Sequence, residues 1–177
     1  MVSEHWKTQP RDERGRWTDE HGFFRTNTSY AQILSVNRGA ISGALDSESR
    51  EAEEHAKRYY EFVRKRKDDV EKIAKNTGFS IQQIQEIKNY LFINVHDFEM
   101  GKGRFYPDYD ISQSWQRLIA GNFEVADIVL LEHEQMEIKF VEEGYSQTEA
   151  HNLTDKVHNY KNAITELKER RKKSGRN

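Results

Sequence analysis

A histidine and two glutamates stand close together in the second half of the chain, in the segment His133-Glu134-x-x-Glu137. On an α-helix, with 100° between successive residues, His133 and Glu137 fall in the middle of an apolar stripe and Glu134 falls at its edge. The apolar members of this stripe are Val129, Leu130, Met136, Phe140 and Val141. An ionisable pair inside an apolar face is costly unless its members bond each other, bond a third group or hold a metal ion. This segment is therefore the first candidate for a chemical site.

Three interpretations of the segment stay open. His133 and Glu137, spaced i, i+4, can share a divalent cation such as Zn²⁺ or Mg²⁺, which leaves Glu134 as a general base. Without a metal, the same side chains can form an acid–base pair, because histidine titrates near neutrality and burial can tune a glutamate upward. In the third interpretation, a satisfied His–Glu pair only fixes helix packing. The segment differs from the peptidase signature His-Glu-x-x-His, because Glu137 stands where that signature needs a histidine.

Further histidines occur near the carboxy terminus. His151 and Asp155 are spaced i, i+4, and His158 follows about one turn later. Helical spacing places all three opposite the apolar stripe of the last predicted helix, so they face either solvent or a cleft against the helix that carries His133. In the second case His151 is the best-placed third group. The predicted metal ligands are then His133, Glu137 and His151.

His96 lies in an irregular aromatic stretch and is the remaining catalytic candidate, because loops often carry catalytic groups. A surface loop is the alternative interpretation. Two arginines, a lysine and a tryptophan that follow His96 in the sequence could contact an anionic substrate. The lysine lies between two glycines, in a turn that could bind a phosphate group. These predicted substrate-binding residues are Lys102, Arg104, Trp115 and Arg117.

The elements that must position these residues are predicted to be helices. The chain has only 2 Pro and 10 Gly, and apolar residues recur three or four apart along most of it after residue 50. Residues 91–109 are the exception and suggest strand or loop, with a hairpin turn at 101–103. We expect a mainly α fold: a compact helical domain with a small β-hairpin or irregular insert. Helices are expected over about 50–75, 81–91, 111–120, 127–143 and 146–170.

Local signals mark several helix ends. Ser80 with Gln83 and Ser146 with Glu149 are capping-box signatures, and Asp127 is expected to cap the helix that carries His133. Glycine tolerates the left-handed conformation that ends many helices. The predicted stops are Gly78, Gly121 and Gly144.

Composition limits the remaining possibilities. The 177 residues suit one domain with tails, and we expect a disordered, flexible tail or linker over 1–28, the helical domain over 29–170 and a basic tail over 171–177. A formal charge of -2 leaves only local basic patches for nucleic acid. The lack of cysteine excludes disulfides and thiolate zinc sites.

Two further features bear on location. Apolar runs are far shorter than the roughly 20 residues that cross a bilayer. The polar amino terminus predicts no signal peptide. We therefore expect no membrane association, and a location in the cytoplasm of a host or target cell or in a phage virion.

A competing motif spans residues 70–89. Its small, apolar and turn residues fit the spacing of a helix-turn-helix, and the second helix offers Gln82, Gln83, Gln85 and Asn89 for reading base edges. The basic run 64–67 could contact phosphates. However, Glu86 against Lys88 leaves the candidate recognition helix without a net positive field.

Several blocks resemble known phage proteins. The stretch 9–17 resembles a Gln-Pro-Arg…Gly-Arg-aromatic segment of phage head proteins. Blocks at 106–118, 131–137 and 144–151 resemble a carboxy-terminal domain fused to phage head-morphogenesis proteins of the Mu F-like class and to bacterial polymorphic toxins. The resemblance covers roughly 59–163 and departs at His158, where a tyrosine is expected. It implies a toxic tip, most often a nuclease, and its matching positions are His96, Trp115, Arg117, His133, Glu134, Glu137 and His151.

The sequence therefore predicts a toxin-like hydrolase, a nuclease rather than a peptidase, with a nucleic-acid substrate and a cognate immunity protein as partners. A divalent cation, Zn or Mg, is the expected cofactor. The alternatives are a metallopeptidase-like toxin that uses Glu134 as its base, and a non-catalytic phage structural or DNA-binding module. The predicted catalytic residues are His133, Glu134, Glu137, His151 and His96.

Overall fold

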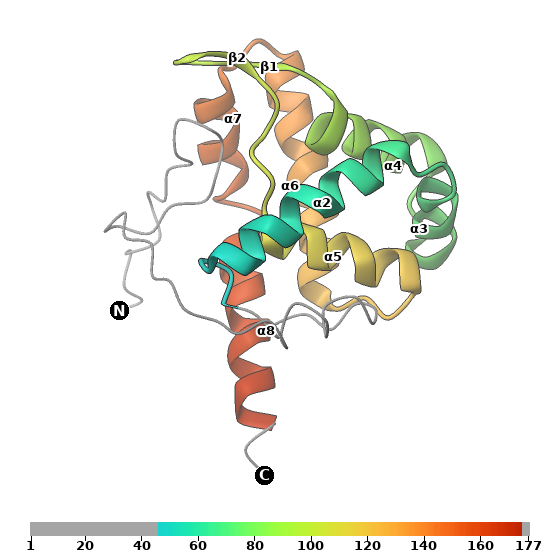
Figure 1. Ribbon diagram of the computed structural model, residues 1–177. Helices are drawn as coiled ribbons and strands as arrows, with labels where there is room; N and C mark the ends of the chain where they lie inside the picture. The colour runs from blue at the N-terminus through green and yellow to red at the C-terminus, as the bar shows by residue number, and fades with distance from the viewer. Residues whose placement is uncertain (1–45, 175–177) are drawn as a thin grey trace.

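The computed structural model describes residues 46–174, which fold into helices and one short antiparallel hairpin (Figure 1). The expectation of a mainly α fold with a small hairpin is confirmed. The predicted tail over 1–28 lies outside the described residues, as do 29–45 and 175–177. No described helix is long and apolar enough to cross a membrane. In order, the elements are α2 (Arg50–Lys65), α3 (Asp69–Thr77), α4 (Ile81–Lys88), the π-helix η2 (Asn89–Ile93), β1 (His96–Phe98), β2 (Gly101–Gly103), α5 (Tyr109–Ala120), α6 (Val125–Glu142), α7 (Gln147–Thr154) and α8 (Tyr160–Ser174).

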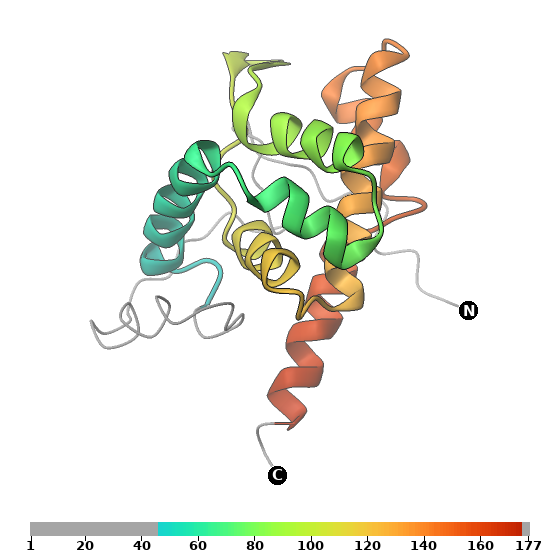
Figure 2. The same cartoon turned by 90° about the vertical axis from the view of Figure 1, so that its right-hand side faces the viewer.

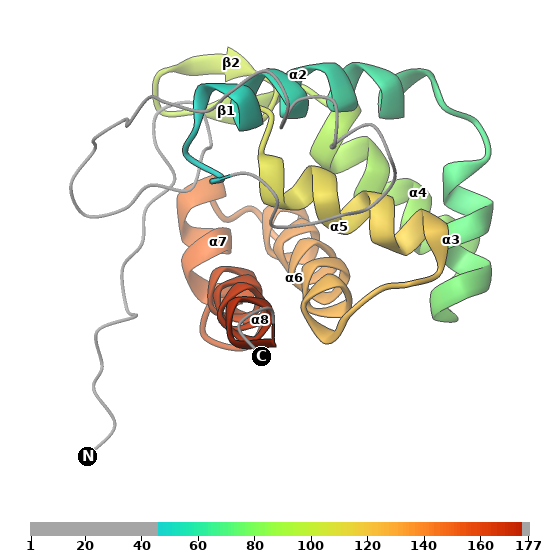
Figure 3. The same ribbon diagram turned by 60° about the horizontal axis from the view of Figure 1, so that its bottom comes forward.

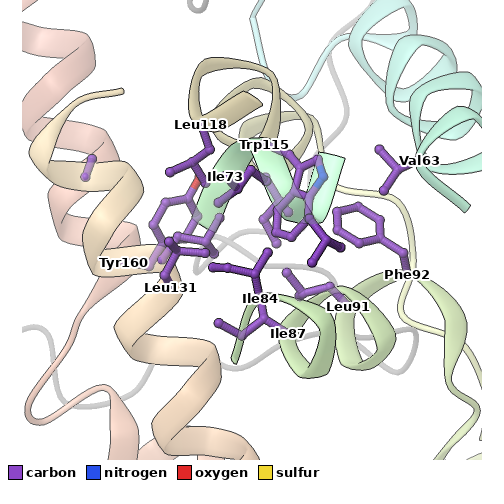
Figure 4. Packing of buried hydrophobic residues seen from close by; sticks show 14 of the residues in the cluster. Val63, Ile73, Ile84, Ile87, Leu91, Phe92, Trp115, Leu118, Leu131 and Tyr160 are labelled. Carbon is purple, nitrogen blue, oxygen red and sulfur yellow. The ribbon is translucent and has the colours of Figure 1, made fainter. Parts of the chain in front are cut away.

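Helix α6 occupies the middle of the fold and contacts α4, α5, α7, α8 and η2. The main core lies between these helices, α2 and α3. Figure 4 shows Trp115 and Phe92 among aliphatic side chains of α3, α4 and η2. Their rings meet edge to face with centroids 5.0 Å apart, and Tyr60 contacts Phe92 in the same way at 4.5 Å. Burying these aromatic rings supplies much of the apolar area that stabilises the domain.

The local signals for helix ends are largely confirmed. Ser80 with Gln83 and Ser146 with Glu149 both form complete capping boxes. Gly78 ends α3 in the left-handed region with φ 82°, a conformation that a residue with a Cβ adopts only under strain. This turn joins α3 to α4, as the helix-turn-helix spacing predicted.

Two helix boundaries were predicted wrongly in the first half of the domain. The helix expected over 50–75 breaks at Arg66, whose backbone is extended, so α2 and α3 are separate. Helical structure also continues through η2 to Ile93, where loop or strand was expected. The hairpin exists, but Gly101–Gly103 is its second strand rather than its turn, because the register pairs Phe98 with Gly101.

The start of α6 also differs from the prediction. Glu124, not Asp127, is the residue immediately before the helix. Asp127 is the third residue of the helix and completes a capping box, in which its carboxylate accepts a hydrogen bond from the Glu124 N–H at 2.8 Å. The signal at Asp127 was therefore read correctly as a helix start but placed at the wrong position.

The last predicted helix, 146–170, is two helices. Helix α7 ends at Thr154, and α8 begins at Tyr160 and runs through Ser174, into the predicted basic tail. The side chain of Asn159 accepts from the Asn162 N–H at 2.8 Å, as a residue at a helix start does. The break allows Tyr160 to enter the core, where it is completely buried. Helix α8 lies beside α6, and its last turns extend away from the other helices (Figures 1 and 2).

Candidate functional site

Helix α6 carries three ionisable side chains into the interior. His133, Glu134 and Glu137 are all buried, with at most 1% of each exposed. Glu134, expected at the edge of the apolar stripe, is completely buried because α6 is covered on several sides. By contrast, Met136, Phe140 and Val141 are only half-buried, although they were expected on the same stripe. The buried face of α6 is thus more polar than the sequence suggested.

Helix α7 adds His151 to this group. It packs against α6 (Figure 3), and His151 is buried. The Nδ1 atom of His151 lies 2.9 Å from Glu137 Oε2, and the Nε2 atom of His133 lies 3.1 Å from the same oxygen. Of the two placements that the sequence left open for His151, the structure has the cleft-facing one.

The residues between α7 and α8 close the group on its other side. Asp155 Oδ2 lies 3.3 Å from His151 Nε2, and Asp155 Oδ1 lies 3.6 Å from His133 Nδ1. His133 Nδ1 also lies 2.7 Å from the backbone oxygen of His158. The Asp155 side chain is 12% exposed, so the cluster reaches the surface here. The His158 side chain points elsewhere and pairs with Glu132 at 3.2 Å. From here on, the polar cluster means His133, Glu134, Glu137, His151 and Asp155.

Two polar residues that the sequence analysis missed support Glu137. The hydroxyl of Tyr90, in η2, lies 2.8 Å from Glu137 Oε1 and 2.8 Å from Gln147 Oε1. Its single proton can be donated to one of these oxygens at a time. Neither residue stood out from its spacing, since Tyr90 falls near the end of the helix expected over 81–91 and Gln147 lies in the first turn of the helix expected over 146–170.

His96 lies behind Tyr90. Its Nε2 atom is 2.8 Å from the Tyr90 backbone oxygen, and its Nδ1 atom is 3.3 Å from the Gln147 side-chain nitrogen. The ring also packs at 4.3 Å from that of Phe105. His96 is therefore connected to Glu137 through other residues, and a positioning role fits its location better than proton transfer to substrate.

A surface groove runs beside this network. Its volume is about 380 Å³, and it borders Tyr90 and His96, which are themselves buried. Through the Tyr90 hydroxyl, one residue of its lining contacts Glu137. It is lined by Tyr90, Asn94, Val95, His96, Ile138, Val141 and Glu142.

Two of the predicted substrate-binding residues belong to the core instead. Arg117 is 1% exposed; its Nε donates to Asp127 Oδ2 at 2.7 Å, and its Nη2 donates to Ser114 and to the other Asp127 oxygen. Burial lowers the pKa of Arg117, but the bonds to Asp127 outweigh it and raise that pKa overall. Trp115 is completely buried and donates to Asp69 at 3.1 Å. The structure thus places both side chains in the core, away from the surface that a substrate would first meet. The sequence could not indicate this, because a charged pair hidden by tertiary packing leaves no periodic signal.

Lys102 and Arg104 remain at the surface. Lys102 pairs with Asp97 across the hairpin at 3.3 Å, and Arg104 donates to the backbone oxygen of Ile93 at 2.9 Å. Both cations lie on or next to the hairpin, near the groove residue His96. Their role in contacting an anion stays a prediction.

The polar cluster contains a group of atoms suited to a metal ion. One nitrogen each of His133 and His151 and one oxygen of Asp155 lie within 4.8 Å of one another. Asp155 therefore takes the place in this group that the sequence analysis gave to Glu137. The signal was present, since His151 and Asp155 are spaced i, i+4, but their exposure could not be judged without the fold.

Comparison of the chain with protein-family models, with curated proteins and with solved structures gives no match. The arrangement of the polar cluster thus carries the functional argument by itself.

Proposed function

We propose that the chain is a toxin-like hydrolase, a nuclease, whose reaction takes place at the polar cluster. The observation that carries this proposal is the convergence of two imidazoles and the Glu137 and Asp155 carboxylates, from α6, α7 and the turn after α7, in contact with one another. Groups of these types are the ones that hydrolases use for general acid–base and metal-ion catalysis.

The energetics of burial support a functional origin for the cluster. A buried ion pair or polar network is often no more stabilising than apolar residues of similar volume, because desolvation offsets the attraction. Several ionisable side chains buried together are more typical of a functional site than of a hydrophobic core. His133, Glu134 and Glu137 occupy positions that leucine or methionine would fill on this face of α6.

Each residue has a distinct proposed role. Asp155, the most exposed member of the cluster at 12%, would meet the scissile phosphate, with the buried His151 beside it. Glu134 would activate the attacking water. Glu137 would orient the two imidazoles, and Tyr90 would orient Glu137. A divalent cation at this place would polarise the phosphate and lower the pKa of its bound water.

A nucleic-acid substrate fits the charges around the opening. Lys156 is exposed and directly follows Asp155. Further exposed cations, Arg170, Lys172 and Lys173, lie at a distance from Asp155, on the last turns of α8 that extend away from the other helices (Figure 1). Such local basic groups can attract a polyanion even though the whole chain is slightly acidic. The toxin-like character and the immunity partner rest on the resemblance to phage-associated toxic tips.

The DNA-reading alternative is less favoured by the contacts of α4. Lys88 is buried in an ion pair with Asp69 at 2.7 Å, so the exposed face of α4 keeps Glu86 without that cation. Gln82 bonds Glu86, and Gln85 bonds Asn89. A recognition helix normally presents free polar groups in a positive field.

The test is cleavage by the purified full chain. RNA, single-stranded DNA, duplex DNA and casein are each incubated with the wild type and with His151→Ala and Glu134→Gln variants, with added Zn²⁺ or Mg²⁺. The matched control is His158→Ala, which removes an imidazole whose side chain lies outside the cluster. We expect a nucleic acid to be cut by the wild type and the control, and both cluster variants to be slower by at least about 100-fold.

Other results assign the alternatives. Cleavage of casein alone would favour the peptidase, and sequence-specific retention of duplex DNA that Gln82→Ala abolishes would favour the binding module. Equal cleavage by all folded variants would refute a site at the polar cluster.

A further inference from the structure

Glu137 holds one nitrogen of each imidazole. Its Oε2 atom lies 3.1 Å from His133 Nε2 and 2.9 Å from His151 Nδ1. An ionised Glu137 only accepts hydrogen bonds, so with Glu137 in that form each of these nitrogens donates a proton to it. The carboxylate thereby fixes the tautomer of a neutral imidazole, as carboxylates do for metal-binding histidines.

The opposite nitrogens of the two rings face a second carboxylate. His133 Nδ1 lies 3.6 Å from Asp155 Oδ1, and His151 Nε2 lies 3.3 Å from Asp155 Oδ2. With the ring protons directed at Glu137, both of these nitrogens present lone pairs toward Asp155. Lone pairs and a carboxylate repel one another unless a proton or a cation lies among them.

The backbone oxygen of His158 bears on whether a proton or a cation lies among these atoms. It lies 2.7 Å from His133 Nδ1 and, as a carbonyl, it also only accepts. One solution is a second proton on His133, which would then be an imidazolium that donates to His158 and to Glu137. The other solution is a cation bonded to His133 Nδ1, and it requires the His158 carbonyl to move away, because an ion about 2.1 Å from Nδ1 in the direction of that oxygen would overlap it. The ligand types decide between them, because two imidazoles and one carboxylate on a common centre are typical of zinc sites.

We propose that His133 Nδ1, His151 Nε2 and the Asp155 carboxylate bind a zinc-type divalent cation, with Glu137 positioning both histidines from behind. Bonds of about 2.1 Å in a tetrahedral site place neighbouring ligand atoms roughly 3.4 Å apart. The separations are close to this value: Asp155 Oδ1 lies 3.6 Å from His133 Nδ1 and Asp155 Oδ2 lies 3.3 Å from His151 Nε2. One nitrogen of each histidine and one Asp155 oxygen also lie within 4.8 Å of one another. To close on the ion, the site must move the His158 carbonyl off His133 Nδ1 and turn one Asp155 oxygen toward both imidazoles.

The ligand count indicates the kind of site. Three protein ligands leave a fourth position for water, which is typical of catalytic rather than structural zinc. Asp155, whose side chain is 12% exposed, is the ligand nearest to the solvent from which that water would enter. A catalytic role of the cation rests on the proposed hydrolase function, but binding of the cation can be measured without any substrate.

The experiment is calorimetric titration of ZnCl₂ into the full chain after treatment with a chelator and dialysis. We expect one equivalent of zinc per chain. The Asp155→Asn variant, nearly isosteric and partly exposed, removes a ligand charge and should abolish the stoichiometric step. Glu137→Gln keeps the ligands but loses one accepted hydrogen bond, and should weaken binding by about 10–100-fold.

Two controls separate this site from loose binding at the surface. Asp97→Asn removes an exposed carboxylate of the hairpin, and His158→Ala removes an imidazole that pairs with Glu132. Both should bind zinc as the wild type does. Circular dichroism establishes that each variant is folded.

Failure to bind zinc in the wild-type chain would overturn the proposal, whether or not any variant folds. Binding that is unchanged in both Asp155→Asn and Glu137→Gln would overturn it as well. The two proposals fail separately. Zinc uptake without cleavage of any substrate keeps the site and refutes the hydrolase, whereas cleavage together with no zinc uptake in calorimetry keeps the hydrolase and refutes the cation site.

Discussion

The buried pair of Arg117 and Asp127 allows a quantitative prediction. Asp127→Asn keeps the shape of the side chain but leaves the Arg117 guanidinium, which is 1% exposed, without its countercharge. The variant also weakens the acceptor for the Glu124 N–H at the start of α6. Breaking one side of a buried ion pair typically costs about 3–5 kcal/mol. Because total stabilities are about 5–15 kcal/mol, the variant should lose a large fraction of its free energy of unfolding.

The assay is urea denaturation followed by circular dichroism, together with the thermal midpoint, which should fall by about 6–20 °C. The matched control is Asp97→Asn, whose ion pair with Lys102 is exposed at 78% on the aspartate side and should contribute nothing measurable. The double variant Arg117→Met/Asp127→Leu should recover much of the stability, since it removes both charges from the core.

A different result would restore a substrate-binding role for Arg117. If Asp127→Asn lost less than about 1 kcal/mol while Arg117→Lys abolished cleavage in a fully stable protein, the guanidinium would have to face substrate rather than Asp127. The structural assignment of Arg117 would then be wrong.

Three further predictions concern titration and the site. Burial lowers the pKa of His55 to about 4 from 6.5, so the unfolded state binds more protons than the folded state between these two pH values. The contribution of the neutral His55 to stability, at most about 3 kcal/mol, is therefore full above pH 6.5 and is lost as the pH falls toward 4. The variant His55→Gln should flatten this part of the curve of unfolding free energy against pH. Burial raises the pKa of Asp108 to about 6 from 3.8, so the stability of the fold decreases as the pH rises between these two values. The variant Asp108→Asn still accepts the hydrogen bond from the Ile111 N–H and should unfold at a higher urea concentration than the wild type at pH 7. An unchanged urea midpoint would contradict this reasoning. The variant Tyr90→Phe removes a hydrogen-bond donor to Glu137. It should lower the free energy of unfolding, measured by urea denaturation, by about 1.5–3 kcal/mol and should slow any cleavage. Wild-type stability and cleavage rate in this variant would show that the hydrogen bond does not contribute to the site.

Local chemistry explains which parts of the fold could be predicted. The capping boxes at Ser80 and Ser146 and the left-handed Gly78 depend on neighbouring residues only, and all three are confirmed. The division of 146–170 depends on burying Tyr160 against other helices, which no local pattern encodes. The π-helix η2 likewise follows from tertiary packing of its aromatic side chains.

The same distinction applies to the polar cluster. His133 and Glu137 could be found because an ionisable pair on an apolar helical stripe is anomalous within a single segment. His151 could be found only as one of two alternatives, since its environment depends on how α7 packs against α6. Asp155 contacts His151 locally, at the i, i+4 spacing, but its contact with His133 arises only when the turn after α7 meets α6. Tyr90 likewise reaches Glu137 only when η2 meets α6.

The most direct test of a catalytic role for the polar cluster is the rate of nucleic-acid cleavage by His151→Ala relative to His158→Ala, at equal concentration of folded protein. Both variants remove one imidazole, but only the first removes a contact to Glu137. We expect cleavage by His158→Ala at the wild-type rate and cleavage by His151→Ala reduced by at least about 100-fold. Equal rates for the two variants would show that the cluster serves helix packing alone.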